Sequence, residues 1–151
     1  MNFKECLSKG MIRKDKSALE RVKKSLEIAE RFLTSAKKNF EIEELEMTEI
    51  ASYNSIFHSA RSLLFKKEYT ERSHICVILA LKELYKNDHE LIDLLNTFDK
   101  IRISRHNIQY GGILIDLEEA TFVFEFAQRF LEETKKYLKK RNRQIKCFIL
   151  I

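Results

Sequence analysis

Apolar residues recur every three or four positions along four long stretches of this chain, and no proline interrupts any of them. This spacing places the apolar side chains on one face of an α-helix. The 151 residues include only three glycines, and 34% of them are charged. This composition suits long solvated helices and fits neither a sheet-rich sandwich nor a disordered chain. The sequence therefore predicts an all-α fold, an antiparallel four- or five-helix up-and-down bundle.

The expected bundle covers residues 17–140 and is a single domain. Its helices are predicted at roughly 17–40, 48–67, 71–86, 89–109 and 117–140. Capping-box patterns at Ser17 and Asp116 indicate two of the starts, and Gly111-Gly112 indicates the end of the fourth helix. Residues 1–16 are weakly patterned, so we expect a short helix or a frayed lead-in. Residues 66–70 are expected to form a turn.

The net charge of +5 comes from basic residues near the C-terminal end of the sequence. Seven basic residues and no acidic residue lie between Lys135 and Lys146. Without them, 21 basic residues face 23 acidic ones, a net charge of −2. A generic phosphate-binding surface over the body of the domain is therefore not supported. The tail, residues 141–151, ends in five apolar residues; it is suited to an anionic surface, to a partner or to disorder, and we assign it no function.

Several classes of protein are excluded by pattern. No apolar run approaches the length of about 18 residues that a membrane span needs, and the N-terminus carries no secretory signal. Cys6, Cys76 and Cys147 are odd in number and far apart, so they predict no disulfide framework. Together with four histidines they also show no metal spacing, and no cofactor is expected. A reducing cytoplasm is the expected location.

The most informative stretch is 98–112, at the end of the fourth helix. The apolar stripe that leads into it should continue at position 105, where the residue is Arg105. Arg105 lies roughly 20° around the helix from Phe98, and Arg102 roughly 40°. His106 lies one turn before Tyr110, so these two side chains share a face. Two guanidinium groups are thus expected where a hydrophobic contact would normally lie. The residues of the stripe are Leu91, Leu94, Phe98 and Ile101.

A structural explanation of these arginines stays open. Basic residues near a helix C-terminus interact favourably with the helix dipole, and long side chains can cover apolar surface with their stems. The functional alternative is that an anion meets Arg105. Because an unpaired guanidinium inside a monomer is costly, we also expect a symmetric dimer that shares the cleft.

Two further sets of polar residues are candidates for the same cleft. Asn54, His58 and Arg61 form a column beside Phe57 on the second helix. This column is either one wall of a polar cleft or a set of satisfied groups at the margin of the core. His74 falls in the first turn of the third helix, where it is a candidate for holding a phosphate or a simple packing residue.

Three segments together resemble the HEPN family, a small helical bundle of prokaryotes and archaea. Tyr53–Leu64 is similar to its helix with Phe-His, Ala-Arg and Leu-Leu pairs, and Tyr69–His74 to the step that opens its next helix. Arg105–Gly111 resembles its signature, in which Arg is followed four or five positions later by His or Tyr. The resemblance covers roughly residues 17–140, and its order and spacing are more specific than any single segment.

The resemblance implies a homodimer with the Arg-containing motifs of both subunits facing one cleft. In the active branch it implies a metal-independent endoribonuclease, in which Arg105 would hold the scissile phosphate and a His would assist proton transfer. Such domains are often encoded beside a minimal nucleotidyltransferase as a toxin–antitoxin pair. Here Tyr110 occupies the position of the terminal His, and a phenol is a poor general base at neutral pH. Tyr110 is instead, by resemblance, a candidate target of nucleotide transfer.

Three hypotheses follow. The first is a HEPN-like dimer that binds a nucleotide or RNA phosphate and works with a minimal nucleotidyltransferase. The second is an active ribonuclease toxin, and the third is a structural bundle whose polar stripe is a dimer contact. The candidate catalytic residues are Arg105, His106 and Tyr110. The candidate ligand-binding residues are Arg102, Gln109, Asn54, His58, Arg61 and His74.

Overall fold

The computed structural model describes the backbone of residues 1–149 and the side chains of residues 1–139. Within residues 1–149 the chain forms six α-helices, one 3-10 helix and two short strands, which confirms the predicted helical bundle. In chain order the elements are α1 (Phe3–Ser8), β1 (Ile12–Lys14), η1 (Lys16–Arg21), α2 (Val22–Glu41), α3 (Leu45–Lys66), β2 (Tyr69–Glu71), α4 (His74–Leu84), α5 (His89–Gly111) and α6 (Leu117–Ile149).

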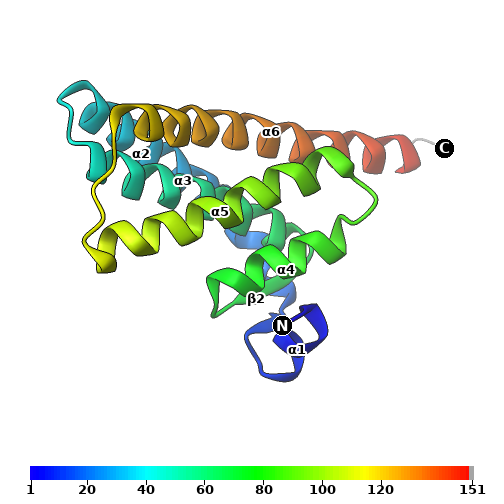
Figure 1. Ribbon diagram of the computed structural model, residues 1–151. Helices are drawn as coiled ribbons and strands as arrows, with labels where there is room; N and C mark the ends of the chain where they lie inside the picture. Colours follow the sequence, from blue (N-terminus) through cyan, green and yellow to red (C-terminus); the bar gives the residue numbers. More distant parts are fainter. Residues whose placement is uncertain (150–151) are drawn as a thin grey trace.

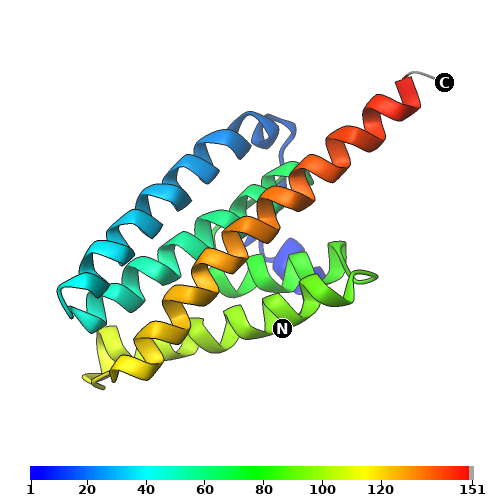
Figure 2. The same ribbon diagram turned by 90° about the horizontal axis from the view of Figure 1, so that it is seen from above.

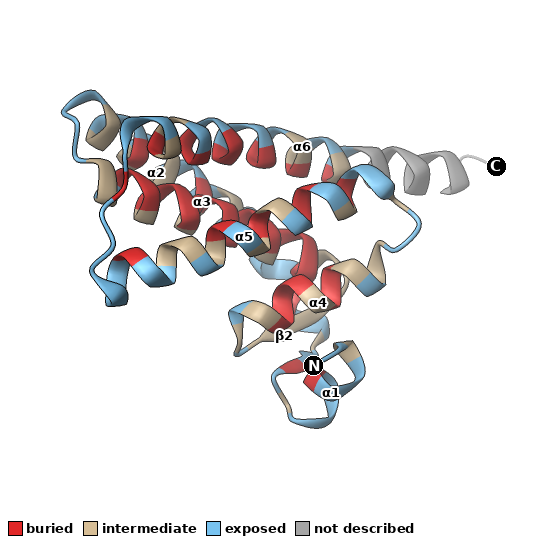
Figure 3. Cartoon of the chain, viewed as in Figure 1, coloured by how far each residue is buried: buried red, intermediate tan, exposed pale blue. Residues whose placement is uncertain are grey.

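Helix α3 is the centre of the bundle. It packs against α2 on one side and α6 on another. Helices α4 and α5, which follow each other in the chain, contact its remaining face (Figures 1 and 2). Fourteen of its 22 residues are buried. Most of these buried side chains are apolar or small, as expected for a helix that its neighbours cover on most sides. Figure 3 shows this burial along α3 and along the inner faces of α5 and α6.

Three buried serines at the contact of α2 and α3 have hydrogen-bond partners, whereas the buried Ser52 hydroxyl of α3 has none among the described residues. Ser55 Oγ donates to the carbonyl of Ala29 on α2 at 2.8 Å, and Ser25 Oγ of α2 donates to the carbonyl of His58 at 2.7 Å. Ser59 Oγ bonds within α3, to the carbonyl of Ser55 at 2.9 Å. Each buried hydroxyl of this set therefore has an acceptor, which removes the penalty of burying it.

The start of α2 differs from the prediction. The chain enters it through the 3-10 turn η1, and the α-helix begins only at Val22. The capping residue is Asp15 rather than Ser17, because Asp15 Oδ1 accepts from the Ser17 amide at 2.9 Å and from its hydroxyl at 2.6 Å. The Ser17 hydroxyl is thus used as a donor and does not cap the helix.

Other predicted helix ends are confirmed. Asp116 Oδ1 accepts from the Glu119 amide at 2.8 Å, which is the expected cap of α6. Gly112 follows α5 with φ of 69°, the left-handed conformation that glycine adopts at helix C-termini. Helix α6 runs to Ile149, beyond the predicted end at residue 140. The side chains of the 141–151 tail lie outside the described part of the chain.

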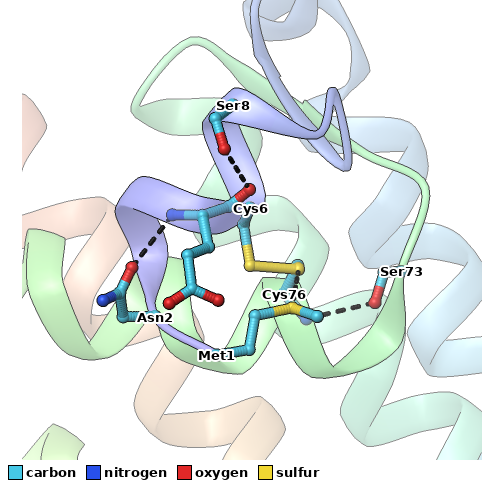
Figure 4. The surroundings of a disulfide bond; sticks show 7 residues. Met1, Asn2, Cys6, Ser8, Ser73 and Cys76 are labelled. Carbon is cyan, nitrogen blue, oxygen red and sulfur yellow. Dashed lines mark hydrogen bonds between the residues drawn. A yellow bond between two sulfur atoms is a disulfide. The ribbon is translucent and has the colours of Figure 1, made fainter.

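The first 15 residues join the fold more closely than the sequence predicts. Strand β1 pairs antiparallel with β2, with Ile12 opposite Glu71, so part of the expected turn at 66–70 is a strand. A disulfide joins Cys6 of α1 to Cys76 in the first turn of α4 (Figure 4). The prediction that these cysteines remain unpaired is therefore wrong. The error has a physical reason, since the strand pairing brings together two segments 70 residues apart.

No helix within the described residues is long and apolar enough to cross a membrane. The main core gathers side chains from α3, α4, α5 and α6, with Tyr53, Phe98 and Phe130 among its largest fully buried members. Phe98 packs against both other rings at 5.8 Å between centroids. The cluster includes the ring of Tyr53, over which the Arg105 guanidinium of α5 lies.

Candidate functional site

Arg105 is seated on an aromatic ring of the neighbouring helix. Its guanidinium carbon lies 4.4 Å from the centroid of the Tyr53 ring, within the range of a cation–π contact. Its Nη1 donates to Gln109 Oε1 at 2.8 Å, one turn further along α5. Its Nε is buried and has no hydrogen-bond partner among the described residues. Arg105 thus occupies the inner position that the stripe of α5 assigns to an apolar side chain.

The two arginines of α5 differ in their electrostatic environment. Arg102 Nε donates to Asp99 Oδ1 at 2.9 Å, so its charge is partly neutralised within the helix. Among the side chains that the structure describes, no carboxylate lies within ion-pair distance of Arg105. A partly buried guanidinium that lacks a counter-ion is a costly arrangement for a purely structural residue. The positive charge that remains available at this site is therefore that of Arg105.

Tyr53 connects Arg105 to His74. The Tyr53 hydroxyl and His74 Nδ1 share a hydrogen bond of 2.6 Å, and the His74 ring stacks on Phe57 at 3.9 Å between centroids. Burial lowers the pKa of His74, and the nearby guanidiniums of Arg105, Arg102 and Arg61 lower it further. The imidazole is therefore neutral at neutral pH and can donate or accept a hydrogen bond without adding charge.

Burial raises the pKa of the Tyr53 phenol, and the Arg105 guanidinium opposes that rise. The phenol remains protonated at neutral pH. It therefore provides a neutral ring face to Arg105 and a hydroxyl to His74.

The column on α3 is mostly occupied by structural contacts. Arg61 Nε lies 2.7 Å from Glu71 Oε1 of β2, and its guanidinium covers the ring of Phe65 at 5.0 Å. His58 stacks on Phe32 at 5.6 Å, and burial together with Arg61 lowers its pKa to about 4. These contacts favour the interpretation of the column as the margin of the core. Asn54 lies half-buried in the same column.

His106 and Tyr110 lie together on the exposed side of α5. Their ring centroids are 5.0 Å apart, and Tyr110 is 67% exposed. Because adjacent residues are about 100° apart around a helix, His106 points away from the face that Arg105 uses. The structure thus divides the candidate residues into an inner group around Arg105 and an outer pair at the end of α5.

Sequence reasoning missed two features near Arg105. The first is the contact between the Tyr53 ring and the Arg105 guanidinium. The family resemblance identified Tyr53 only as part of a helix motif. The second is Glu49, one turn before Tyr53, which is fully buried and whose carboxylate oxygens lie within hydrogen-bond distance of no described donor. Ser104, next to Arg105, donates to Glu119 at 2.7 Å in the same region. No group of three or more potential metal ligands occurs among the described residues.

Two relatives and a family model match most of this chain. The protein named "Putative toxin MJ0142" of Methanocaldococcus jannaschii is 28% identical over 126 residues, covering 82% of this chain and 81% of that protein. The protein named "Putative toxin MJ0605" of the same organism is 28% identical over 136 residues, covering 87% of this chain and 98% of its own length. The family model of the HEPN domain matches residues 22–137, and the chain therefore belongs to the HEPN domain family.

Proposed function

We propose that this chain is a HEPN domain of a toxin–antitoxin-type pair and that Arg105 binds a phosphate group of a nucleotide or an RNA. One observation carries the proposal: the Arg105 guanidinium is held half-buried on the Tyr53 ring with no carboxylate partner among the described side chains. A phosphate would supply the missing negative charge and accept more than one N–H bond from the planar guanidinium.

The surroundings of Arg105 suit a phosphate better than a carboxylate of the protein itself. Arg102 is close enough to lower the pKa of His74, so its charge also reaches the site. His74 is exposed and neutral, so it can take part in hydrogen bonding to a bound nucleotide. The aromatic rings beneath Arg105 fix its position before the anion arrives, which reduces the entropy lost on binding.

The proposal includes two protein partners, a second copy of the chain and a minimal nucleotidyltransferase. Its support is the name of the two relatives and an exposed apolar surface at the end of α5 and in the connection to α6. Exposed apolar side chains gathered in one place indicate a contact with another protein. The exposed phenol of Tyr110 lies in this surface, where a nucleotidyltransferase can reach it. The residues of the surface are Ile103, Tyr110, Ile113, Leu114 and Leu117.

Binding measurements with matched variants test the proposal. Arg105→Met keeps an apolar stem over Tyr53 and removes the charge. It should weaken binding of a labelled single-stranded RNA or nucleotide by about tenfold to about a hundredfold, the cost of one charge-assisted contact. Arg129→Met, at an exposed position of α6, is the control and should bind as the wild type does. Equal or negligible binding by all three proteins would leave only a structural role for Arg105.

A metal-independent endoribonuclease is the second candidate. The observation that favours it is the exposed His106–Tyr110 pair at the end of α5, on the same helix as the phosphate-binding arginine. Purified protein incubated with RNA in EDTA should then cleave it, and Arg105→Met should not. Intact RNA after incubation with the wild type removes this candidate and leaves the binding proposal in place.

The dimer and the transferase partner have separate tests. Size-exclusion chromatography at micromolar concentration should give the mass of two chains, and a monomer would count against the shared cleft. After incubation with the nucleotidyltransferase and ATP, mass spectrometry should find an added nucleotide on the peptide that contains Tyr110. Modification at another residue, or none, would contradict the role proposed for Tyr110.

A further inference from the structure

A second cationic site lies at the other end of α3, beside the two-stranded ribbon. A cavity of about 300 Å³ lies there, lined by β1, β2, the N-cap and the last residue of η1, and residues Gly10 and Arg72 that flank the ribbon. Its lining includes four basic side chains and two acidic ones. The basic residues are Arg13, Lys14, Arg21 and Arg72. This cavity gathers more positive charge than the near-neutral body of the domain predicts.

The two carboxylates of the cavity are already engaged. Asp15 accepts from the amide and the hydroxyl of Ser17, at 2.9 and 2.6 Å, as the cap of η1. Glu71 pairs through Oε1 with Arg61 of α3 at 2.7 Å. Both carboxylates also interact electrostatically with Arg21. Because the lining holds four basic and two acidic side chains, it keeps a net charge of +2.

Three of the four cations have no ion-pair partner among the described side chains. Lys14 lies 3.6 Å from Glu68, whereas Arg13, Arg21 and Arg72 are within ion-pair distance of no described carboxylate. All three of these arginines are exposed, so a ligand from solution can reach them.

The backbone at Gly10 shapes the cavity. Gly10 has φ of +68°, and a Cβ at this position would lie 3.3 Å from Arg13 Nη2. The absence of a side chain at Gly10 lets the Arg13 guanidinium lie close over the turn before β1. The backbone of Arg13 lies opposite Thr70 across the ribbon. The local structure thus leaves room for the Arg13 guanidinium beside the turn.

We propose that this cavity binds a backbone phosphate of a single-stranded RNA whose other phosphate is held by Arg105. The inference rests on the proposed function and extends it to the ligand class, an RNA strand rather than a mononucleotide. Guanidinium groups without carboxylate partners are suited to phosphate oxygens, and each phosphate contact adds affinity without regard to base sequence.

The cavity and the Arg105 site are connected by a continuous series of contacts. Glu71 lines the cavity and pairs with Arg61, whose guanidinium covers the Phe57 ring at 5.7 Å. His74 stacks on the same ring at 3.9 Å and belongs to the seat of Arg105. These contacts link the two sites through the protein, and the exposed His74 lies at the Arg105 end of the series.

The test compares Arg13→Gln/Arg72→Gln with Lys37→Gln/Lys38→Gln, a pair of exposed lysines on α2 that serves as the control. The arginine double variant should weaken binding of a fluorescent 12-nucleotide RNA by about tenfold. It should also reduce the slope of log affinity against log salt by about 0.7 for each phosphate group that the variant no longer neutralises. Binding of uridine monophosphate at the Arg105 site should not change, because that site does not include the two substituted arginines. The lysine variant should behave as the wild type in every measurement.

These measurements distinguish a failure of the second site from a failure of the proposed function. If Arg105→Met weakens RNA binding and the arginine double variant does not, the second site is refuted and the proposed function stands. If only the double variant weakens RNA binding, the proposed role of Arg105 is refuted.

Calorimetry with pyrophosphate tests the alternative that the cavity binds a small free phosphate. Loss of pyrophosphate binding in the double variant, with RNA binding unchanged, would show a site for a small free phosphate and overturn the RNA assignment. Circular dichroism should show that every variant is folded.

Discussion

Glu49 offers a sharp test of the packing that seats Arg105. Its side chain is fully buried on α3, one turn before Tyr53, and no donor among residues 1–139 lies within hydrogen-bond distance of its carboxylate, although the Ser104 hydroxyl is near enough to act on it. Burial raises the pKa of Glu49 from 4.5 to about 7; the Glu119 carboxylate acts in the same direction, and the Ser104 hydroxyl opposes it. The change that isolates this group is Glu49→Gln, which has nearly the same shape and cannot ionise.

The sign of the effect follows from proton linkage. Because the native pKa of Glu49 lies above its unfolded value, the native state keeps the proton to higher pH than the unfolded state does. The carboxyl has almost no effect on stability well below pH 4.5, where both states are protonated, and becomes increasingly destabilising as pH rises to about 7. A shift of this size corresponds to about 3 kcal/mol of unfolding free energy at pH 8. For a chain of this length, that is a difference of about 6 to 12 °C in Tm.

Denaturant titrations at pH 4.5 and pH 8 measure the effect. The free energy of unfolding of Glu49→Gln, relative to the wild type, should be about 3 kcal/mol more favourable at pH 8 than at pH 4.5. Glu132→Gln, at an exposed position of α6, should show a difference of less than about 0.5 kcal/mol. If Glu49→Gln and Glu132→Gln shift equally between the two pH values, Glu49 is not the buried, unpaired carboxyl described above.

Three further predictions concern stability. Gly112→Ala should lower the unfolding free energy by about 1 kcal/mol because of the positive φ, whereas Gly111→Ala, with open space around its Cβ, should leave it nearly unchanged in the same denaturant titration. Reduction of the Cys6–Cys76 disulfide should cost up to about 4 kcal/mol in the loop-closure model, and peptide mapping without reductant should recover the two linked peptides. Tyr53→Phe keeps the ring beneath the guanidinium but loses the imidazole hydrogen bond, and a loss of about 1 kcal/mol should appear in thermal unfolding.

The long helices could be predicted because their core faces follow the helical period. In α6, Ala120, Val123, Ala127 and Leu131 are all buried, as the three-and-four spacing requires. The true start of α2 could not be predicted in this way. Asp15 and Ser17 are both good capping residues, and local sequence does not show which of the two accepts from the free backbone amides at the start of the helix.

The ribbon and the disulfide were beyond sequence reasoning for a different reason. Strands of three residues are too short to show a period, and their pairing joins parts of the chain that are distant in sequence. Without that pairing, nothing places Cys6 beside Cys76. For the same reason, the sequence could not predict the second cationic site, whose lining comes from both β1 and β2.

The candidate site was only partly predictable. The helical angle placed Arg105 on the inner face of α5, and in the structure it lies half-buried against Tyr53. The same angle separates His106 from Arg105, although the two residues are adjacent in sequence. The partners of Arg105 on other helices depend on how α3, α4 and α5 cross, which the period of one helix does not determine. A buried Glu49 also runs against the usual exposure of glutamate, so no pattern would have indicated it.

The most direct test of the central claim is to observe the Arg105 guanidinium during titration with a 5′-phosphorylated oligoribonucleotide. Its Nε–H signal in a ¹H–¹⁵N spectrum is assigned as the arginine signal that disappears in Arg105→Lys. Because this Nε lacks a partner in the structure, the account predicts that its signal shifts progressively and saturates as the RNA binds. A signal that stays in place while the RNA binds and shifts other resonances would show that the phosphate is held elsewhere.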